Sequence, residues 1–135
     1  MATTNASISI SSSDLLPGMA MTYYKSSTLH KAGGCHGLEK MMSGTVEYTS
    51  TSTVVLLDQS ALSVTANKAN KLYVKNLSTD TTEYFIVTIN AEELGRLYAG
   101  DWMFIPWSAE DSSADVKVAP SVESSMKLEY VLVHE

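Results

Sequence analysis

The chain of 135 residues contains one cysteine, Cys35, which excludes an internal disulfide framework. Its longest apolar runs cover only a handful of residues, whereas a helix needs roughly 20 to cross a bilayer. The first residues, Met1 to Ser7, lack the basic region and the apolar stretch of a secretory signal. We therefore expect a protein that is made and folded in a cytoplasm and has no membrane partner.

Positive charge is also scarce, because nine Lys and Arg stand against fifteen Asp and Glu, for a net charge of −6. The imbalance lies in residues 45–135, where six basic and thirteen acidic residues give −7. Residues 1–44 carry three basic and two acidic residues, a balance of +1. A basic stripe is the expected footprint of a nucleic-acid-binding protein, so we expect no nucleic-acid partner.

Hydroxyl side chains are abundant, with 19 Ser and 13 Thr, and this composition favours strands and turns over helices. From Thr45 onward, apolar and polar residues alternate in about eight segments separated by polar turns, as in sandwiches and barrels. Only residues 90–96 could hold a helical turn. Without long helices for crossovers, the sheets must be mainly antiparallel, so we predict an all-β antiparallel β-sandwich. The predicted strands are 45–49, 51–57, 62–66, 71–77, 83–89, 97–107 (a turn, then a strand), 115–120 and 127–133.

Residues 1–44 form a second region, which holds five of the seven glycines and has weak periodicity. Only Ile8-Ser9-Ile10 alternates, and Pro17-Gly18 is a turn signature. The region is too apolar for a solvated tail, yet it lacks the alternation to build its own sheet. We predict an extended arm, residues 1–44, that docks on a neighbouring subunit or on its own body, residues 45–135. Being slightly basic, the arm would dock most easily on an acidic surface.

The segment 97–107 contains both tryptophans and is apolar on both faces. Gly100-Asp101 supplies the bend, because glycine accepts a positive φ. We predict that Trp102 and Phe104 point into the sandwich, toward the apolar residues Phe85, Val87 and Leu128. The opposite face is then left for a second subunit or for the arm. The predicted interface residues are Tyr23, Tyr24, Met103, Ile105 and Trp107.

Chemistry-bearing residues are few, and each set has an ordinary structural explanation. Neighbours such as Cys35 and His36 do not form a nucleophile–base pair without a spatial hydrogen bond and an orienting group. The carboxylate pairs 92–93 and 110–111 fall in predicted turns, where they would be solvated. Four potential zinc ligands lie within ten residues, but their spacing matches no established zinc pattern. These are His30, Cys35, His36 and Glu39. We expect no enzyme, no metal site and no cofactor.

The aromatic residues leave two interpretations open. They could form a sugar-stacking platform, as in a carbohydrate-binding adhesion module, or they could fill a sandwich core and a subunit interface. We favour core and interface, because Met103 and Pro106, rather than Asn, Asp or Gln, flank the tryptophans. The residues concerned are Tyr84, Phe85, Tyr98, Trp102, Phe104 and Trp107.

Five segments of residues 70–135 form one recurring pattern of strands and turns: 70–78 (NKLYVKNLS), 83–89 (EYFIVTI), 97–106 (LYAGDWMFIP), 116–120 (VKVAP) and 128–133 (LEYVLV). Together they resemble small β-sandwich virion proteins of tailed bacteriophages, of the head-decoration, cement and tail-accessory kind. The resemblance implies a jelly-roll-like sandwich, oligomers that are often trimers, docking on a capsid or tail, and no catalytic residues. We therefore expect a capsid decoration or cement protein located in the virion, with a tail or fibre component as the alternative. Its expected partners are further copies of itself and the major capsid protein or other virion proteins.

Overall fold

The computed structural model describes residues 3–62, 64, 67–110 and 114–135. The chain divides into two compact units, Met1–Glu39 and Lys40–Glu135, and each is described by itself. The predicted boundary at Gly44 falls inside the second unit, because strand β3 (Lys40–Tyr48) already begins at Lys40. None of the described helices is long and apolar enough to cross a membrane.

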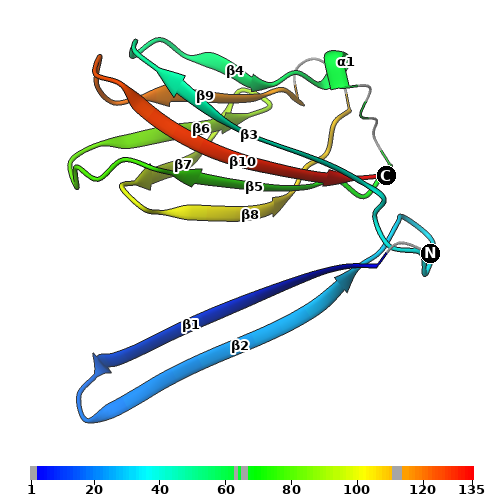
Figure 1. Ribbon diagram of the computed structural model, residues 1–135, viewed down its shortest axis with the longest axis horizontal. Helices are drawn as coiled ribbons and strands as arrows, with labels where there is room; N and C mark the ends of the chain where they lie inside the picture. The colour runs from blue at the N-terminus through cyan, green and yellow to red at the C-terminus, as the bar shows by residue number, and fades with distance from the viewer. Residues whose placement is uncertain (1–2, 63, 65–66, 111–113) are drawn as a thin grey trace. The chain divides into compact units, whose positions relative to one another are not determined.

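The first unit is a β-hairpin rather than a single extended arm. Strands β1 (Thr4–Leu16) and β2 (Met19–Leu29) pair antiparallel around Pro17 and Gly18 (Figure 1). Gly18 has a φ of +77°, the sign that the third position of a type II turn requires, so the predicted turn is confirmed. The expectation that this region cannot build its own sheet is wrong, because β1 and β2 pair with each other from Thr4↔Leu29 to Ser12↔Met21.

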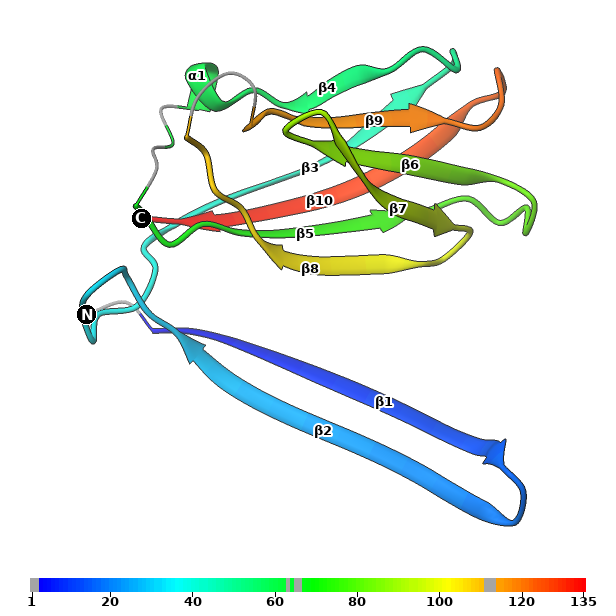
Figure 2. The ribbon, with the colours of Figure 1, turned by 180° about the vertical axis from the view of Figure 1, so that it is seen from behind.

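The second unit is a sandwich of two antiparallel sheets. Over the described residues, four strands lie in the order β3-β10-β5-β8 and four in the order β4-β9-β6-β7 (Figures 1 and 2). This interleaving of strands between two sheets is the order of a jelly roll, so the predicted all-β, antiparallel, jelly-roll-like sandwich is confirmed. The remaining strands are β4 (Val54–Leu57), β5 (Lys71–Asn76), β6 (Tyr84–Ile89), β7 (Glu92–Tyr98), β8 (Trp102–Pro106), β9 (Val116–Pro120) and β10 (Met126–His134).

Two predicted elements differ from the structure. The expected strand 62–66 begins at Leu62, but Leu62 is the last residue of a short helix, α1 (Gln59–Leu62). Three other residues of that expected strand, Ser63, Thr65 and Ala66, lie outside the described residues. Asp58 caps this helix by accepting hydrogen bonds from the backbone N–H groups of Ser60 (2.8 Å) and Ala61 (3.1 Å).

The second difference is β7, which occupies the segment expected to hold a helical turn. Asn90 and Ala91 both have positive φ, at 54° and 61°, as a tight hairpin turn between β6 and β7 requires. Gly95, with φ +151°, lies where the β6–β7 register shifts, so it accommodates a bulge within the strand.

The core lies between the two sheets and contains the apolar side chains that the alternation predicted. Phe85, Val87 and Leu128 are fully buried, as expected. The ring of Tyr48 packs edge-on against Phe85, with 5.9 Å between centroids. Other fully buried members are Leu57, Leu72, Val74, Val116, Val118, Met126 and Leu132. Since the inner faces are filled, interaction surfaces must be sought on the outer faces and on the hairpin.

Candidate interaction surfaces

Trp107, predicted to lie at an interface, is instead a core residue of the body. Its side chain is only 2% exposed, and its indole N–H donates to the carbonyl oxygen of Ala114 at 2.7 Å. Its backbone N–H donates to the carbonyl oxygen of Asn70 at 3.0 Å. The prediction fails because Trp107 follows the end of β8, where backbone and side-chain bonds tie it into the interior.

The predicted facing of β8 is also wrong. Met103 and Ile105 pack against the core rather than facing a second subunit. The β5–β8 register explains this, because Met103 lies opposite Val74 and Ile105 opposite Leu72, and both β5 residues are fully buried. A strand that is apolar on both sides cannot reveal its inward face by pattern alone, so the pairing partner decides.

The two aromatic side chains expected inside therefore lie outside. Trp102 is 46% exposed and Phe104 is 41% exposed. Phe104 lies opposite Tyr73 in the sheet, and the Tyr73 and Trp102 rings have their centroids 6.1 Å apart with a 33° angle between planes. We call these three residues, Tyr73, Trp102 and Phe104, the aromatic patch. It lies on the outer face of the β3-β10-β5-β8 sheet. Strand β8 forms one edge of that sheet (Figure 2).

Polar and aliphatic side chains surround the aromatic patch on the same outer face. The register places Glu129 opposite Lys75, which is itself opposite Trp102. Partial burial, and then the negative charge of Glu129, raise the pKa of Tyr73. Lys127 pairs with Glu47 at 3.9 Å, one outward-facing position along β10 from Glu129. The register places three further apolar side chains and two further lysines on this face: Met41, Val131, Val133, Lys71 and Lys75.

The charge of this outer face differs from that of the unit as a whole. Three lysines and the two glutamates Glu47 and Glu129 give it a balance of +1. Residues 40–135 contain seven basic and thirteen acidic residues, a balance of −6. The acidic excess therefore lies elsewhere on the body, and the outer face combines exposed aromatic rings with near neutrality.

The hairpin carries the second candidate surface, which the sequence analysis missed. The β1–β2 register sets Ile10 opposite Tyr23 and Ile8 opposite Lys25, so these side chains share a face. We call this the apolar hairpin face. Its apolar members are Ala6, Ile8, Ile10, Met21, Tyr23 and Leu29. The opposite face holds Asn5, Ser7, Ser9, Ser11, Thr22, Tyr24, Ser26 and Thr28. The signal was present as alternation in Ala6–Ile10, but too short to extend without the pairing.

The predicted interface tyrosines lie on opposite faces of the hairpin. Tyr23 belongs to the apolar hairpin face and is 49% exposed, whereas Tyr24 stands among hydroxyl side chains and is 62% exposed. A single flat partner cannot contact both. Interface contacts made by Tyr23 and by Tyr24 both remain predictions.

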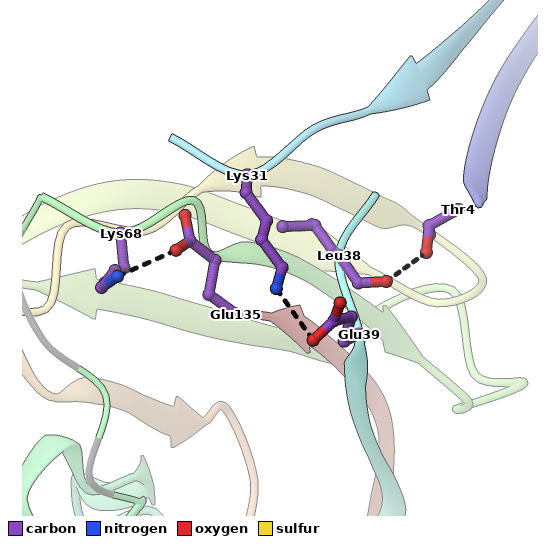
Figure 3. A network of polar contacts seen from close by, with 6 residues as sticks. All are labelled: Thr4, Lys31, Leu38, Glu39, Lys68 and Glu135. Atoms are coloured by element: carbon purple, nitrogen blue, oxygen red, sulfur yellow. Dashed lines mark hydrogen bonds and ion pairs between the residues drawn. The ribbon is translucent and has the colours of Figure 1, made fainter. Parts of the chain in front are cut away.

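The segment after β2 lies at the base of the hairpin and contains the four residues considered as zinc ligands. Most of its polar contacts are of an ordinary structural kind. Thr4 donates from its hydroxyl to the carbonyl oxygen of Leu38 at 2.8 Å, and Lys31 pairs with Glu39 at 2.8 Å (Figure 3). The hydrogen bond and charge of Lys31 lower the pKa of Glu39. His30 contacts the backbone oxygen of Cys35, not its sulfur. Throughout the described part of the chain, no cluster of three such ligands forms.

The other ion pair in Figure 3 belongs to the second unit. Glu135 pairs with Lys68 at 3.0 Å and accepts a hydrogen bond from the backbone N–H of Ala69 at 3.0 Å. These contacts fasten the end of the chain to the segment that leads into β5. They hold the body together and involve neither the aromatic patch nor the apolar hairpin face.

A shallow open depression of about 440 Å³ lies beside the turns that precede β6 and β10. Its side chains are engaged locally, since Ser124 donates to Glu83 at 3.0 Å. Hydrogen bonds from Thr82 lower the pKa of Asp80, which caps its own turn. The depression is lined by Leu77, Ser78, Thr79, Asp80, Glu83, Ser124, Ser125 and Lys127.

The two carboxylate pairs of the sequence lie elsewhere. The pair 92–93 is exposed on β7 rather than in a turn, and Asp111 of the pair 110–111 lies outside the described residues.

Comparison with known proteins gives little beyond this geometry. The sequence matches no protein-family model and no curated protein. Among solved structures, the chain is similar to the cupin domain of Schizosaccharomyces pombe Cnp3, at 12% identity and a TM-score of 0.47. The match covers 98% of this chain and 84% of that one. A likeness at this level identifies neither a ligand nor a partner for this chain.

Proposed function

We propose that this protein works by contact, as a virion structural protein of a tailed bacteriophage that decorates or cements the capsid. The observation that carries the proposal is the apolar hairpin face. A two-stranded hairpin is marginally stable by itself, and among the described residues of its unit no third strand or helix covers this face. Exposed apolar surface of this kind marks a site of protein–protein contact.

A decoration role suits such a hairpin. An arm laid over a neighbour adds buried area at low protein mass, and a repeated lattice multiplies weak contacts into avidity. The resemblance of residues 70–135 to phage decoration and cement proteins supports the same role, with the major capsid protein as the docking partner. Catalysis has no part in the proposal.

Charge contributes less to this docking than the sequence suggested. The balance of +1 assigned to residues 1–44 includes Lys40, which belongs to β3. Residues 1–39 carry two basic residues, Lys25 and Lys31, and two acidic residues, Asp14 and Glu39, so the hairpin unit is neutral. The proposed attraction is therefore burial of apolar side chains rather than a basic arm on an acidic surface.

The test is the protein content of purified virions from the source of this gene. Quantitative mass spectrometry should find this chain in a fixed ratio to the major capsid protein. A ratio of the same order as that protein supports decoration, whereas a few copies per particle would move the chain to the tail or fibre. Its absence from the purified particles would contradict the proposal.

A second candidate function, carbohydrate binding, is favoured by one observation. The exposed ring of Trp102 and the half-buried ring of Tyr73 lie together on the body, with Lys75 beside Trp102 in the register. Aromatic faces with adjacent polar groups suit sugar stacking. A glycan array tests this: a specific signal that Trp102→Ala abolishes supports it, and a blank array counts against it. Trp107 is no probe for it, because that side chain is buried.

A further inference from the structure

We infer that the aromatic patch, together with Lys71 and Lys75, binds an acidic saccharide, one that carries carboxylate groups on its sugar rings. The inference deepens the second candidate function, carbohydrate binding, on which it rests, and it names the class of sugar. It uses a surface of the body alone, so the apolar hairpin face stays available for docking on a capsid.

The site is built from the outward-facing side chains of two paired strands. Along the outer face of β5, Lys71, Tyr73 and Lys75 follow one another at alternate positions. The β5–β8 register sets Tyr73 opposite Phe104 and Lys75 opposite Trp102. The two lysines are therefore about 13 Å apart along the strand, at about 3.3 Å per residue, with the Tyr73 position midway.

The rings supply a stacking surface for sugars. Trp102 is 46% exposed and Phe104 is 41% exposed, and the centroid of the Trp102 ring lies 6.1 Å from that of Tyr73. Aromatic side chains offer a broad apolar face, and Tyr and Trp add a polar group at its edge, which suits the apolar C–H faces and hydroxyl rims of sugars. Three neighbouring rings favour an oligosaccharide over a single sugar.

The two lysines are available to bind anions. Within the described residues, neither Lys71 nor Lys75 belongs to an ion pair, whereas Lys127 and Lys68 are each held by a glutamate. A lysine carries its charge on a flexible stem, so each ammonium can reach a carboxylate on a ligand that lies across the rings. The site therefore favours a saccharide with negative charge over a neutral one.

Glu129 makes the two ends of the site unequal. It lies opposite Lys75 in the β10–β5 register, whereas the residue opposite Lys71 is Val133. The carboxylate of Glu129 offsets part of the positive charge of Lys75 and repels a carboxylate ligand. We therefore expect Lys71 to be the stronger anion contact.

The charge of the rest of the body favours a short acidic saccharide over single-stranded nucleic acid. Bases also stack on aromatic rings beside basic side chains, so a single strand is the competing ligand. A strand, however, carries a phosphate on every nucleotide and would continue from the site over a unit with a balance of −6. A short oligosaccharide can lie within the site and avoid that repulsion.

A glycan array of the full chain tests the class of ligand, with oligosaccharides that contain uronate or sialic acid beside neutral ones. We expect a signal from acidic saccharides and none from neutral ones. A signal from neutral saccharides that equals or exceeds the acidic signal would overturn the inference and leave carbohydrate binding standing. A blank array would overturn both, and each of these results leaves the virion role to its own test.

The acidic ligand with the strongest signal and its methyl ester, which lacks the negative charge, then form a matched pair. Fluorescence of Trp102 reports binding, because the other tryptophan, Trp107, is only 2% exposed. At low salt we expect Lys71→Gln to weaken binding of the acid roughly fivefold and Glu129→Gln to tighten it roughly twofold. Neither change should alter the affinity for the methyl ester, and an ester that binds as tightly as the acid would overturn the inference without any variant.

Lys127→Gln is the control, because it removes the same charge from the same outer face at a residue already paired with Glu47. It should leave the affinity for the acid unchanged, and circular dichroism checks that each variant folds. Equal losses in Lys71→Gln and Lys127→Gln would show an effect of overall charge and overturn the inference. A short oligothymidylate that binds more tightly than the acidic saccharide would overturn it in favour of nucleic acid.

Discussion

The two phenylalanines of this chain lie in opposite environments. Phe85 is fully buried against Tyr48, and Phe104 is 41% exposed on the aromatic patch. The sequence predicted the face of Phe85, because Phe85, Val87 and Ile89 share one face of β6 and the polar Thr88 lies on the other. It could not predict Phe104, because β8 is apolar on both faces and only its pairing with β5 decides which face turns inward.

Phe85→Ala should lower the free energy of unfolding by about 3–5 kcal/mol, because it leaves a cavity in the core. Phe104→Ala should lower that of the monomer by less than about 1 kcal/mol, since its ring is already partly in water. Urea denaturation of both variants, at a concentration where the chain is monomeric, measures the difference. Equal losses would mean that the assigned faces of β6 and β8 are wrong.

At the scale of elements, the repeated alternation after Thr45 predicted most strands of the body. The hairpin was not predicted, because the alternating stretch Ile8-Ser9-Ile10 is short. Only the register with β2 shows that Tyr23 and Met21 continue the same face. β7 escaped because positive φ at two consecutive residues, 90 and 91, turns a segment with helical composition into a hairpin. Local composition could not show either long-range pairing.

The pairing of β3 with β10 contains a glycine that an aromatic ring covers. A Cβ atom at Gly44 would meet ring atoms of Tyr130 at 3.0–3.2 Å. Such cover of an edge-strand glycine by a cross-strand aromatic residue helps to fix register. Gly44→Val should therefore destabilise the body by about 1–3 kcal/mol through overcrowding.

A double-mutant cycle identifies the cause. The double variant Gly44→Val with Tyr130→Ala should lose less free energy of unfolding than the two single losses added together. Urea denaturation should give a coupling of about 0.5–3 kcal/mol. Strictly additive losses would show that the ring does not limit this position.

At the scale of the molecule, the chain combines a jelly-roll body with a hairpin that has one apolar face. The sequence predicted the division into arm and body, but not its position at Glu39 or the sheet structure of the arm. It placed Met103 and Ile105 on the outer face of β8, whereas the structure turns them inward and exposes Trp102 and Phe104. Which face of a doubly apolar strand is buried depends on contacts far apart in sequence.

The central claim is that this chain works by contact as an oligomer, and sedimentation equilibrium of the unmodified chain tests it most directly. Over a series of concentrations, we predict a mass that rises to a whole-number multiple, greater than one, of 14.6 kDa. A mass that stays at 14.6 kDa at every concentration would contradict the account.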